Sequence, residues 1–464
     1  MIAGVVREAA RRFGDRIAIV APDGEEITYR DLYRRSEAVA GGLLERGIGK
    51  GDVVAVTFGS SIEYVLAYLG AARIGAITAG VNPRYSDEER DKVLDRLQPT
   101  LVLSSRDDLP NGEAPEQRLP MDAERPVAVV FTSGTTGEPK GAVFCNRQLA
   151  AITMFDTGGV WGGGGPMLAS TELAHVGFMT KLPWYLRTGS RIHMLERWRA
   201  EDALRTISEQ KIQTVGGIAA QIALMLRLPN FEEYDVSAVK AIVVGGGPSP
   251  AAVIREAKER FGAAYSVRYS STESGGVGTF TAFDAPEDET LYTVGRPRVG
   301  IDLRISDDDE ILLRSPAMLS EYWRDLDATA EAIRDGWLHT GDLGYIDDRG
   351  CLRLIGRRKE MFIRGGYNVY PLEVEAVLGN HPSVAHVAVV PRPDEVMGEI
   401  GVAVVVPHDR RSPPTLEELR RFASDKLAAF KLPEAIRVVD ALPYNGQQKV
   451  DRRRLTQEEA ASVV

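Results

Sequence analysis

Apolar residues in the first hundred positions follow two alternating spacings. Residues 29–46 and 62–74 place apolar side chains at helical intervals, and those of the second stretch fall near one face. Between them, residues 52–58 form a run of apolar residues that predicts a buried strand. Strands and helices that alternate at this spacing favour a parallel sheet covered by helices.

The same alternation returns further along the chain. Strands are expected at residues 126–131 and 239–244, and helices at residues 202–210 and 251–261. Periodicity is lost at residues 105–125 and 161–166, where we expect loops. We therefore predict an α/β fold in which a large N-terminal domain contains doubly wound parallel sheets.

From residue 301 onward the pattern changes to short strands separated by turn signals, at residues 311–313 and 351–355. This pattern predicts a β-rich segment that closes the large domain. A smaller α+β unit is expected beyond residue 359. Its strands are predicted at residues 385–390 and 402–406, and its helix at residues 416–426.

Composition narrows the functional classes. The 464 residues are 44% hydrophobic and 26% charged, as in globular proteins, with a formal net charge of −10. This balance argues against a nucleic-acid partner, and no apolar run is long enough for membrane insertion. Only Cys145 and Cys351 occur, which excludes a disulfide framework and suits a reducing compartment. Because the N-terminus lacks a signal-peptide core, we expect a cytoplasmic location.

The most informative chemistry lies in residues 131–141, which read Phe-Thr-Ser-Gly-Thr-Thr-Gly-Glu-Pro-Lys-Gly directly after a predicted strand. Glycines allow backbone N–H groups to approach a ligand closely. The hydroxyls of Ser133, Thr135 and Thr136 add donors, and Lys140 adds a cation. This set suits a triphosphate, although it lacks the Gly-Lys-Ser/Thr ending of the Walker pattern.

Five further motifs follow in order. They are Val-Val-Gly-Gly-Gly-Pro at 243–248, Tyr-Ser-Ser-Thr-Glu at 269–273, Trp-Leu-His-Thr-Gly-Asp at 337–342, Gly-Arg-Arg-Lys-Glu at 356–360 with Ile-Arg-Gly-Gly at 363–366, and Pro-Tyr-Asn-Gly-Gln-Gln-Lys at 443–449. With the 131–141 run, they resemble the motifs of the adenylate-forming superfamily, which includes acyl-CoA synthetases, other acid–CoA ligases and luciferases. The resemblance covers nearly the whole chain.

This resemblance implies an N-terminal adenylation domain, residues 1–357, and a small mobile α+β C-terminal domain, residues 358–464, with Lys359 as the hinge residue. It implies ATP, Mg²⁺ and coenzyme A as cofactors and co-substrates. The residues that match its nucleotide-binding motifs are Thr132, Ser133, Gly134, Thr135, Thr136, Gly137, Lys140, Gly245, Gly246, Gly247, Pro248, Tyr269, Ser270, Ser271, Asp342 and Arg357.

The implied roles agree with the chemistry of the side chains. An ionised carboxylate only accepts hydrogen bonds, so Asp342 suits the two ribose hydroxyls. Glu273 would hold Mg²⁺, because an ion bound to phosphates takes only one or two carboxylates. Tyr269 would stack on adenine. A lysine close to a carboxylate and the α-phosphate stabilises both charges. The implied catalytic residues are Lys449, Thr272, Glu273 and His175.

The resemblance also implies two sites for the acyl group and the thiol. The acyl pocket would be lined by His175, Val176, Gly177, Phe178, Gly217, Ile218, Ser270, Gly275 and Gly276. Its glycines predict room for a long or ring-bearing hydrophobic acid, and its histidine is expected to wall or gate the pocket. Arg364, Gly365 and Gly366 would form the coenzyme A tunnel, because glycines leave it open. The same residues also fit a β-turn.

We therefore predict an ATP-dependent acid–CoA ligase acting on a small-molecule carboxylic acid. One alternative passes the acyl group to a carrier protein. An amino-acid activator is disfavoured, since no acidic residue follows His175 in Val-Gly-Phe-Met-Thr. The other alternative is a degenerate relative that only transfers thioesters or binds nucleotide. Gln448 supports this degenerate alternative, because the family usually has glycine at that position. The family also usually has glycine at the position of Ser270. A homodimer is left open.

Overall fold

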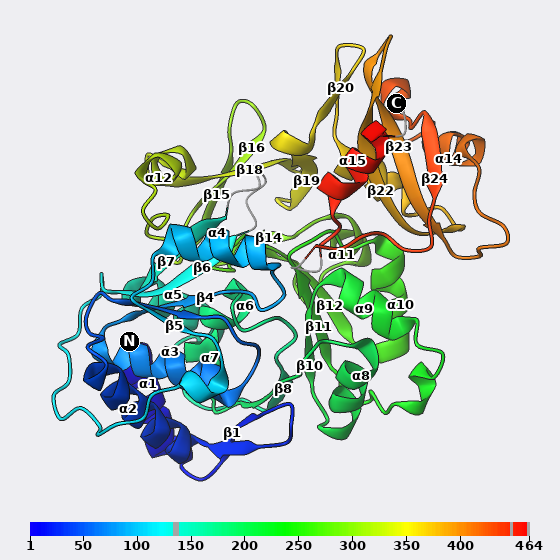
Figure 1. Ribbon diagram of the computed structural model, residues 1–464. Helices are drawn as coiled ribbons and strands as arrows, with labels where there is room; N and C mark the ends of the chain where they lie inside the picture. Colours follow the sequence, from blue (N-terminus) through cyan, green and yellow to red (C-terminus); the bar gives the residue numbers. More distant parts are fainter. Residues whose placement is uncertain (133–138, 446–448, 462–464) are drawn as a thin grey trace.

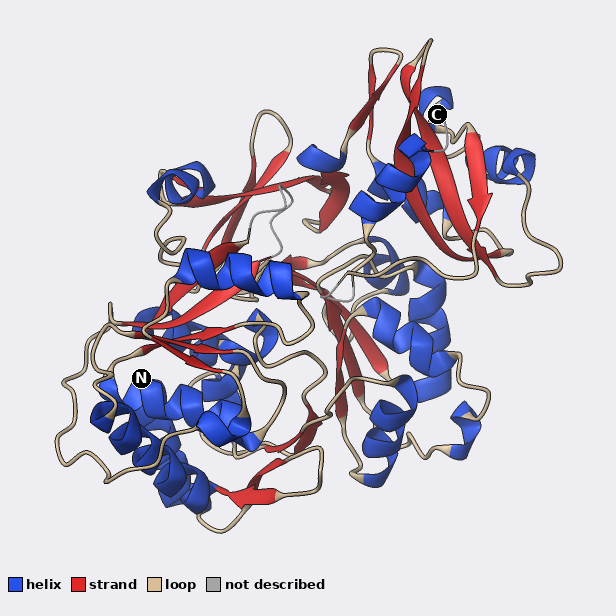
Figure 2. Ribbon diagram, viewed as in Figure 1, coloured by secondary structure: helices blue, strands red, loops and turns tan. Residues whose placement is uncertain are grey.

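The computed structural model describes residues 1–132, 139–445 and 449–461. Within these ranges the strands form five sheets, and helices pack between and over them (Figures 1 and 2). Residues from about 362 onward form a separate C-terminal lobe, orange and red in Figure 1. The mixed α/β architecture with parallel strands confirms the predicted fold class.

The first large sheet has the order β5 (Leu101–Leu103), β3 (Val53–Val56), β4 (Ile77–Gly80), β6 (Pro126–Thr132) and β7 (Lys140–Cys145). Its first four strands are parallel, and β7 is antiparallel. Alternate residues of β3 enter opposite cores, because side chains alternate along a strand. Val54 and Val56 enter the core on the side of α3 (Ile62–Ile74), a core to which α1 (Ile2–Phe13) and α2 (Tyr29–Glu45) also contribute, whereas Val53 and Ala55 share a core with α4 (Asp87–Leu97). Both faces are covered, so this sheet is doubly wound as predicted.

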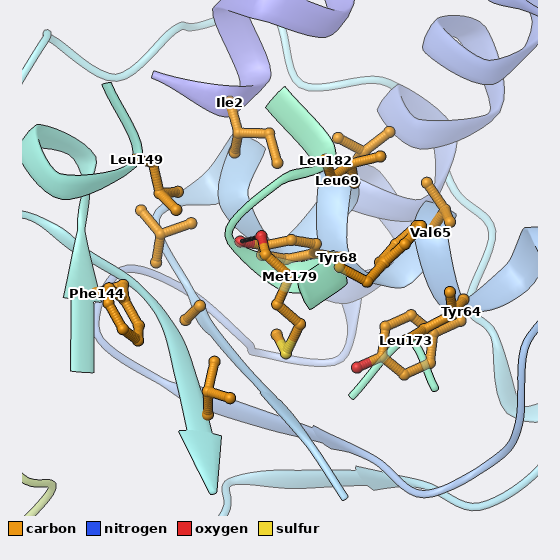
Figure 3. Close-up of a cluster of buried hydrophobic side chains, with 14 of the residues drawn as sticks. Ile2, Tyr64, Val65, Tyr68, Leu69, Phe144, Leu149, Leu173, Met179 and Leu182 are labelled. Atoms are coloured by element: carbon orange, nitrogen blue, oxygen red, sulfur yellow. Dashed lines mark hydrogen bonds between the residues drawn. The ribbon is translucent and has the colours of Figure 1, made fainter. Parts of the chain in front are cut away.

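Helix α3 (Ile62–Ile74) has the predicted bounds but a different environment. Tyr64 and Tyr68 lie opposite the expected apolar face and are nevertheless buried. Figure 3 shows both tyrosines within the same hydrophobic cluster, and the Tyr68 hydroxyl donates to the Met179 carbonyl at 3.0 Å. The helix is therefore buried on more sides than the predicted apolar face, because α3 lies between the sheet and its neighbouring helices.

The second large sheet has the order β10 (Thr214–Gly217), β11 (Ala241–Gly245), β12 (Ala264–Tyr269), β13 (Thr279–Phe280) and β14 (Arg296–Pro297). The first three strands are parallel. They form one hydrophobic core with α8 (Ala200–Glu209), α9 (Ala219–Leu226) and α10 (Ala251–Phe261). A small sheet, β2 (Glu26–Thr28), β1 (Ile17–Val20), β9 (Arg191–His193) and β8 (Pro166–Leu168), was not predicted.

An antiparallel sheet follows, and it confirms the expected β-rich segment. It contains β15 (Asp302–Ile305), β16 (Glu310–Arg314), β18 (Trp337–Ile346), β17 (Ile333–Arg334) and β19 (Leu352–Arg357). The C-terminal lobe contains β21 (Tyr367–Val369), β20 (Phe362–Arg364), β23 (Gly398–Pro407), β22 (Val384–Asp394) and β24 (Ala435–Val438). Helices α13 (Pro371–Leu378) and α14 (Leu416–Ala423) cover one face, and α15 (Arg452–Ala461) covers the other.

The expected helix at 416–426 ends at Ala423, three residues before the predicted end. The two cysteines are buried free thiols, in agreement with the predicted absence of a disulfide. In the part of the chain that the structure describes, no helix combines the length and apolar character needed to cross a bilayer.

Candidate active site

Three elements meet at the carboxylate of Asp342. This residue lies on β18 opposite Arg357 on β19, and Tyr269 ends β12 in the neighbouring sheet. The Tyr269 hydroxyl donates to Asp342 Oδ2 at 2.8 Å, and Arg357 Nε donates to Oδ1 at 2.9 Å. Burial and the adjacent carboxylate raise the pKa of Tyr269 well above its usual range, so the hydroxyl keeps its proton. Each carboxylate oxygen of Asp342 thus accepts one hydrogen bond and retains capacity to accept another.

A second carboxylate, Glu273, follows β12 and is held by a residue that the sequence did not indicate. The Tyr322 hydroxyl donates to Glu273 Oε1 at 2.8 Å, and burial together with this carboxylate raises the pKa of Tyr322. The Lys140 ammonium lies over the Tyr322 ring, 5.3 Å from its centroid. Tyr322 therefore brings the lysine of the 131–141 run close to Glu273.

The rest of that run is only partly described. Thr132 and Lys140 are opposite residues on β6 and β7, and the Thr132 hydroxyl donates to the Lys140 carbonyl at 3.4 Å. The strand pair thus brings together the two ends of the predicted phosphate loop. Ser133, Gly134, Thr135, Thr136 and Gly137 lie outside the described residues, as does Gln448.

The turn after Tyr269 supplies the next group of predicted site residues. Ser271 and Ser274 each accept a hydrogen bond from the backbone of the other, and the Thr272 carbonyl accepts from Gly275 N–H at 2.9 Å. Gly275 has φ +72°, and a Cβ there would lie 2.4 Å from the Ala317 carbonyl oxygen. This glycine is therefore required by backbone conformation and packing as well as by any pocket.

Parallel strands bring the glycine motif to the same edge. Gly217, Gly245 and Tyr269 end β10, β11 and β12, whose carboxyl ends lie side by side. Ligands of open α/β sheets characteristically bind outside this edge. The remaining motif residues, Gly246, Gly247, Pro248 and Ser270, follow these strand ends directly.

Lys449 reaches this site from the C-terminal lobe. It lies in a turn in which its N–H donates to Asn445 Oδ1 at 3.0 Å and Asn445 N–H donates to its carbonyl at 2.8 Å. Burial and Arg357 lower the pKa of Lys449, while the carboxylates of Glu273 and Asp342 act in the opposite direction. The predicted catalytic lysine thus lies near Glu273, the predicted Mg²⁺ ligand, and Asp342, the predicted ribose contact.

His175 borders the same region from α6 (Val176–Met179), which it precedes. Its Nε2 lies 3.3 Å from Asn82 Nδ2, and burial, with Lys449 and Arg84 nearby, lowers its pKa to about 4. A neutral imidazole at neutral pH agrees with a wall or gate rather than a charged group. His175 and Ile218 line one cavity together with Ser60, Arg84, Ala169, Ser170, Thr171, Glu172, Leu195, Trp198 and Gln221.

The other predicted pocket residues have diverse surroundings. The Tyr185 hydroxyl donates to the Gly177 carbonyl at 3.1 Å, and Phe178 is buried in the hydrophobic core, with its ring centroid 6.0 Å from that of Tyr185. A Cβ at Gly276 would lie 3.6 Å from Val176 Cγ2. Val176 and Gly276 are therefore neighbours, as a shared pocket wall requires.

The lowered pKa of His175 predicts a pH-dependent stability. Because the folded state binds this proton less readily than the unfolded chain, stability is retained above the ordinary histidine pKa of 6.5 and falls as the pH drops toward about 4. Between pH 7 and pH 5 the contribution of His175 to this loss should be about 2 kcal/mol. Urea unfolding at both pH values should give a smaller loss for His175→Gln, whereas His408→Gln, an exposed control, should match the wild type. Equal losses in all three proteins would contradict this.

The predicted coenzyme A residues lie elsewhere. Gly365 and Gly366, with φ +55° and +87°, form the two-residue turn between β20 and β21, where Arg364 pairs with Tyr367. Left-handed conformations at both positions suit such a hairpin. Arg364 donates to Glu434 at 2.7 Å within the lobe. Figure 1 shows this hairpin pointing away from the rest of the molecule. Lys359 is exposed in a short 3₁₀ turn, Arg358–Glu360.

A further residue that the sequence did not indicate, Arg452, anchors the segment after Lys449. Its guanidinium donates to both oxygens of Glu375 at 2.5 Å and to the Val389 carbonyl at 3.1 Å. Its Nε also lies 3.3 Å from Glu360 in the predicted hinge. In the sequence, Arg452 is only one of several basic residues that follow Lys449, so no local signal marks it.

Comparisons with known proteins show the family to which the chain belongs. The chain matches the family described as AMP-binding enzyme over residues 6–323 and the AMP-binding enzyme C-terminal domain over residues 373–449. A 3-[(3aS,4S,7aS)-7a-methyl-1,5-dioxo-octahydro-1H-inden-4-yl]propanoyl:CoA ligase of Mycobacterium tuberculosis is 31% identical, with 96% of each chain covered. The fatty acid–[acyl-carrier-protein] ligase ScoC of Streptomyces coeruleorubidus is 30% identical, with 93% of this chain and 92% of that protein covered.

Among solved structures, the o-succinylbenzoate CoA synthetase (MenE) from Bacillus subtilis, in complex with its acyl-adenylate intermediate, has the same fold. The TM-score is 0.84, the identity is 26%, and 97% of both chains is covered. The resemblance seen in the motifs is thus confirmed over both parts of the chain. The chain belongs to the AMP-binding enzyme family and is an acyl-CoA synthetase of the adenylate-forming superfamily.

Proposed function

We propose that this chain is an ATP-dependent acid–CoA ligase with two half-reactions. In the first, a carboxylate attacks the α-phosphate of ATP to give an acyl-adenylate and pyrophosphate. In the second, the thiol of coenzyme A displaces AMP to give an acyl-CoA. The observation that carries this proposal is the position of the half-buried Lys449, which comes from the C-terminal lobe and interacts electrostatically with Glu273 and Asp342. A lysine in that position can neutralise charge on the incoming carboxylate and the α-phosphate.

The other nucleotide contacts follow from this placement. Asp342 would bind the ribose hydroxyls, with Arg357 as a second contact, and Tyr269 would lie against adenine while its hydroxyl orients Asp342. Thr272 would contact the α-phosphate. Thr132 and Lys140 would hold the pyrophosphate together with the intervening loop.

Mg²⁺ fits Glu273 as its single protein ligand. One oxygen of that carboxylate accepts from Tyr322, so the other can face a cation. Among the described residues no cluster of three potential ligands occurs, which suits an ion whose remaining ligands are phosphates and water. When bound, Mg²⁺ would neutralise phosphate charge.

The second half-reaction requires a different arrangement of the two lobes. With Lys449 at the site, the hairpin of Arg364, Gly365 and Gly366 points away from it. We propose that residues 1–357 and 358–464 are the two domains and that rotation about Lys359 exchanges the lysine for the hairpin. Such gating separates steps that need different access.

The acid is proposed to have a ring-bearing or long hydrophobic body. The small residues Gly177, Gly217 and Gly276 support this, as do the ring-bearing acids in the names of similar enzymes. The similarity to ScoC keeps a carrier protein as the alternative acceptor. A homodimer and the cytoplasmic location stay predictions.

Acid-dependent exchange of label between pyrophosphate and ATP, across a panel of carboxylic acids, tests the first half-reaction. Addition of coenzyme A or an acyl-carrier protein, with detection of the thioester, then identifies the acceptor. We expect exchange with a subset of acids and thioester formation on coenzyme A. The absence of exchange with every acid, while supplied acyl-adenylate is still converted to thioester, would instead support the degenerate alternative.

A further inference from the structure

A buried cluster of charged residues lies outside the groups considered so far. Asp156, near the end of α5 (Asn146–Thr157), pairs with Lys181 at 2.6 Å and with Arg298 at 2.7 Å. The Asp156 and Lys181 side chains are only 4% and 8% exposed. These residues come from three separate segments, so the fold has assembled the cluster.

Arg268 adds a third cation to this cluster. It lies on β12, one residue before Tyr269, and it interacts electrostatically with Asp156, Lys181 and Arg298. Its buried Nε has no hydrogen-bond partner, and within the described residues its guanidinium donates to no acceptor. A guanidinium cannot shed its proton to relieve this burial. Three cations therefore share one carboxylate, and one of them lacks an acceptor.

The cluster borders the predicted acyl pocket. A Cβ at Gly276 would lie 3.7 Å from Lys181 Cε, and a Cβ at Gly245 would lie 3.4 Å from the Arg268 Cβ. Tyr185, which donates to the Gly177 carbonyl, also interacts electrostatically with Arg268. Gly177 and Gly276 of the predicted pocket, and Gly245 of the predicted nucleotide-binding motif, thus lie beside the cluster.

The following inference rests on the proposed function. We propose that the acid carries a second carboxylate, remote from the one that is adenylated, and that Arg268 binds this second carboxylate. A partly buried cation without an acceptor for its buried N–H is costly unless a ligand pairs with it, and arginine matches a carboxylate through two parallel hydrogen bonds. Asp156 holds Lys181 and Arg298 in place, and their surplus charge favours an anion beside Arg268. The substrate is then a dicarboxylic acid with a hydrophobic body between its ends.

Matched pairs of acids test this inference on the full-length enzyme. Adipate is compared with hexanoate, suberate with octanoate, and 3-(carboxyphenyl)propanoate with phenylpropanoate, by pyrophosphate exchange. The wild type should favour the dicarboxylate of at least one pair by about 10- to 150-fold in kcat/KM, the range expected for hydrogen bonds to a charged group. Arg268→Gln should remove this preference by raising KM for the dicarboxylate while leaving the monocarboxylate unchanged.

Arg268→Lys retains the charge without the paired donors and should keep part of the preference, and Arg7→Gln, at an exposed position on α1, should keep all of it. A wild-type enzyme that favours the monocarboxylate of every active pair would overturn the inference without any variant. So would an equal loss for both acids in Arg268→Gln, which is the mark of a purely structural arginine. Failure of all acids to support exchange would instead contradict the proposed adenylation itself.

Discussion

Replacement of Lys449 by alanine should abolish adenylation and spare thioester formation. The lysine is half-buried and interacts electrostatically with Glu273 and Asp342, and there its charge would stabilise the reacting carboxylate and α-phosphate. Loss of one such electrostatic contact lowers the rate by about 10²- to 10³-fold. Acid-dependent pyrophosphate exchange should fall by this factor in Lys449→Ala. Conversion of supplied acyl-adenylate and coenzyme A to thioester should continue at close to the wild-type rate, because the lysine withdraws before that step.

Lys426→Ala, at an exposed lysine of the same lobe, is the matched control and should leave both steps unchanged. An equal loss of both half-reactions in Lys449→Ala would refute the proposal that each orientation of the lobes serves only one half-reaction. Full exchange activity in that variant would remove Lys449 from the catalytic residues.

Replacement of Arg452 by methionine should strongly destabilise the C-terminal lobe. Its guanidinium pairs with both oxygens of Glu375, a residue that is 8% exposed. Removal of one partner leaves a buried charge without its counter-ion, which costs about 3–5 kcal/mol. Urea unfolding followed by a probe in the lobe should report this loss. Pyrophosphate exchange should fall as well, because Arg452 also joins the segment of Lys449 to Glu360 in the hinge.

The double variant Arg452→Met with Glu375→Leu separates charge burial from packing. Because an apolar pair of similar volume can replace a buried ion pair, it should recover most of the lost stability. Its exchange activity should stay low, since the contact to Glu360 remains absent. A single variant as stable as the wild type, or a double variant no better than the single one, would contradict this role.

The sequence predicted best where local periodicity carries the signal. The bounds of α3 agree with the predicted 62–74, and those of α10 with 251–261. The small sheet escaped prediction, because it pairs Ile19 with Ile192 and such distant pairings leave no local pattern. The burial of the remaining sides of α3 could not be predicted for the same reason, since only tertiary packing covers them.

For the site, ordered motifs indicated Asp342, Tyr269 and Glu273, and the fold brings them together. The groups that hold these residues in place could not be predicted from the neighbouring sequence. Tyr322 lies 49 positions beyond Glu273 and belongs to no motif. Arg268 did carry a signal, because a charged residue within the largely buried and otherwise uncharged strand Ala264–Tyr269 is unusual and requires a partner.

The path of one oxygen atom tests the central claim most directly. An acid labelled with ¹⁸O in its carboxylate is converted to the thioester, and the phosphorus products are analysed by mass spectrometry. Attack on the α-phosphate predicts that AMP carries one labelled oxygen and that pyrophosphate carries none. Label in inorganic phosphate with release of ADP, or AMP without label, would show that the carboxylate never bonded to the innermost phosphorus.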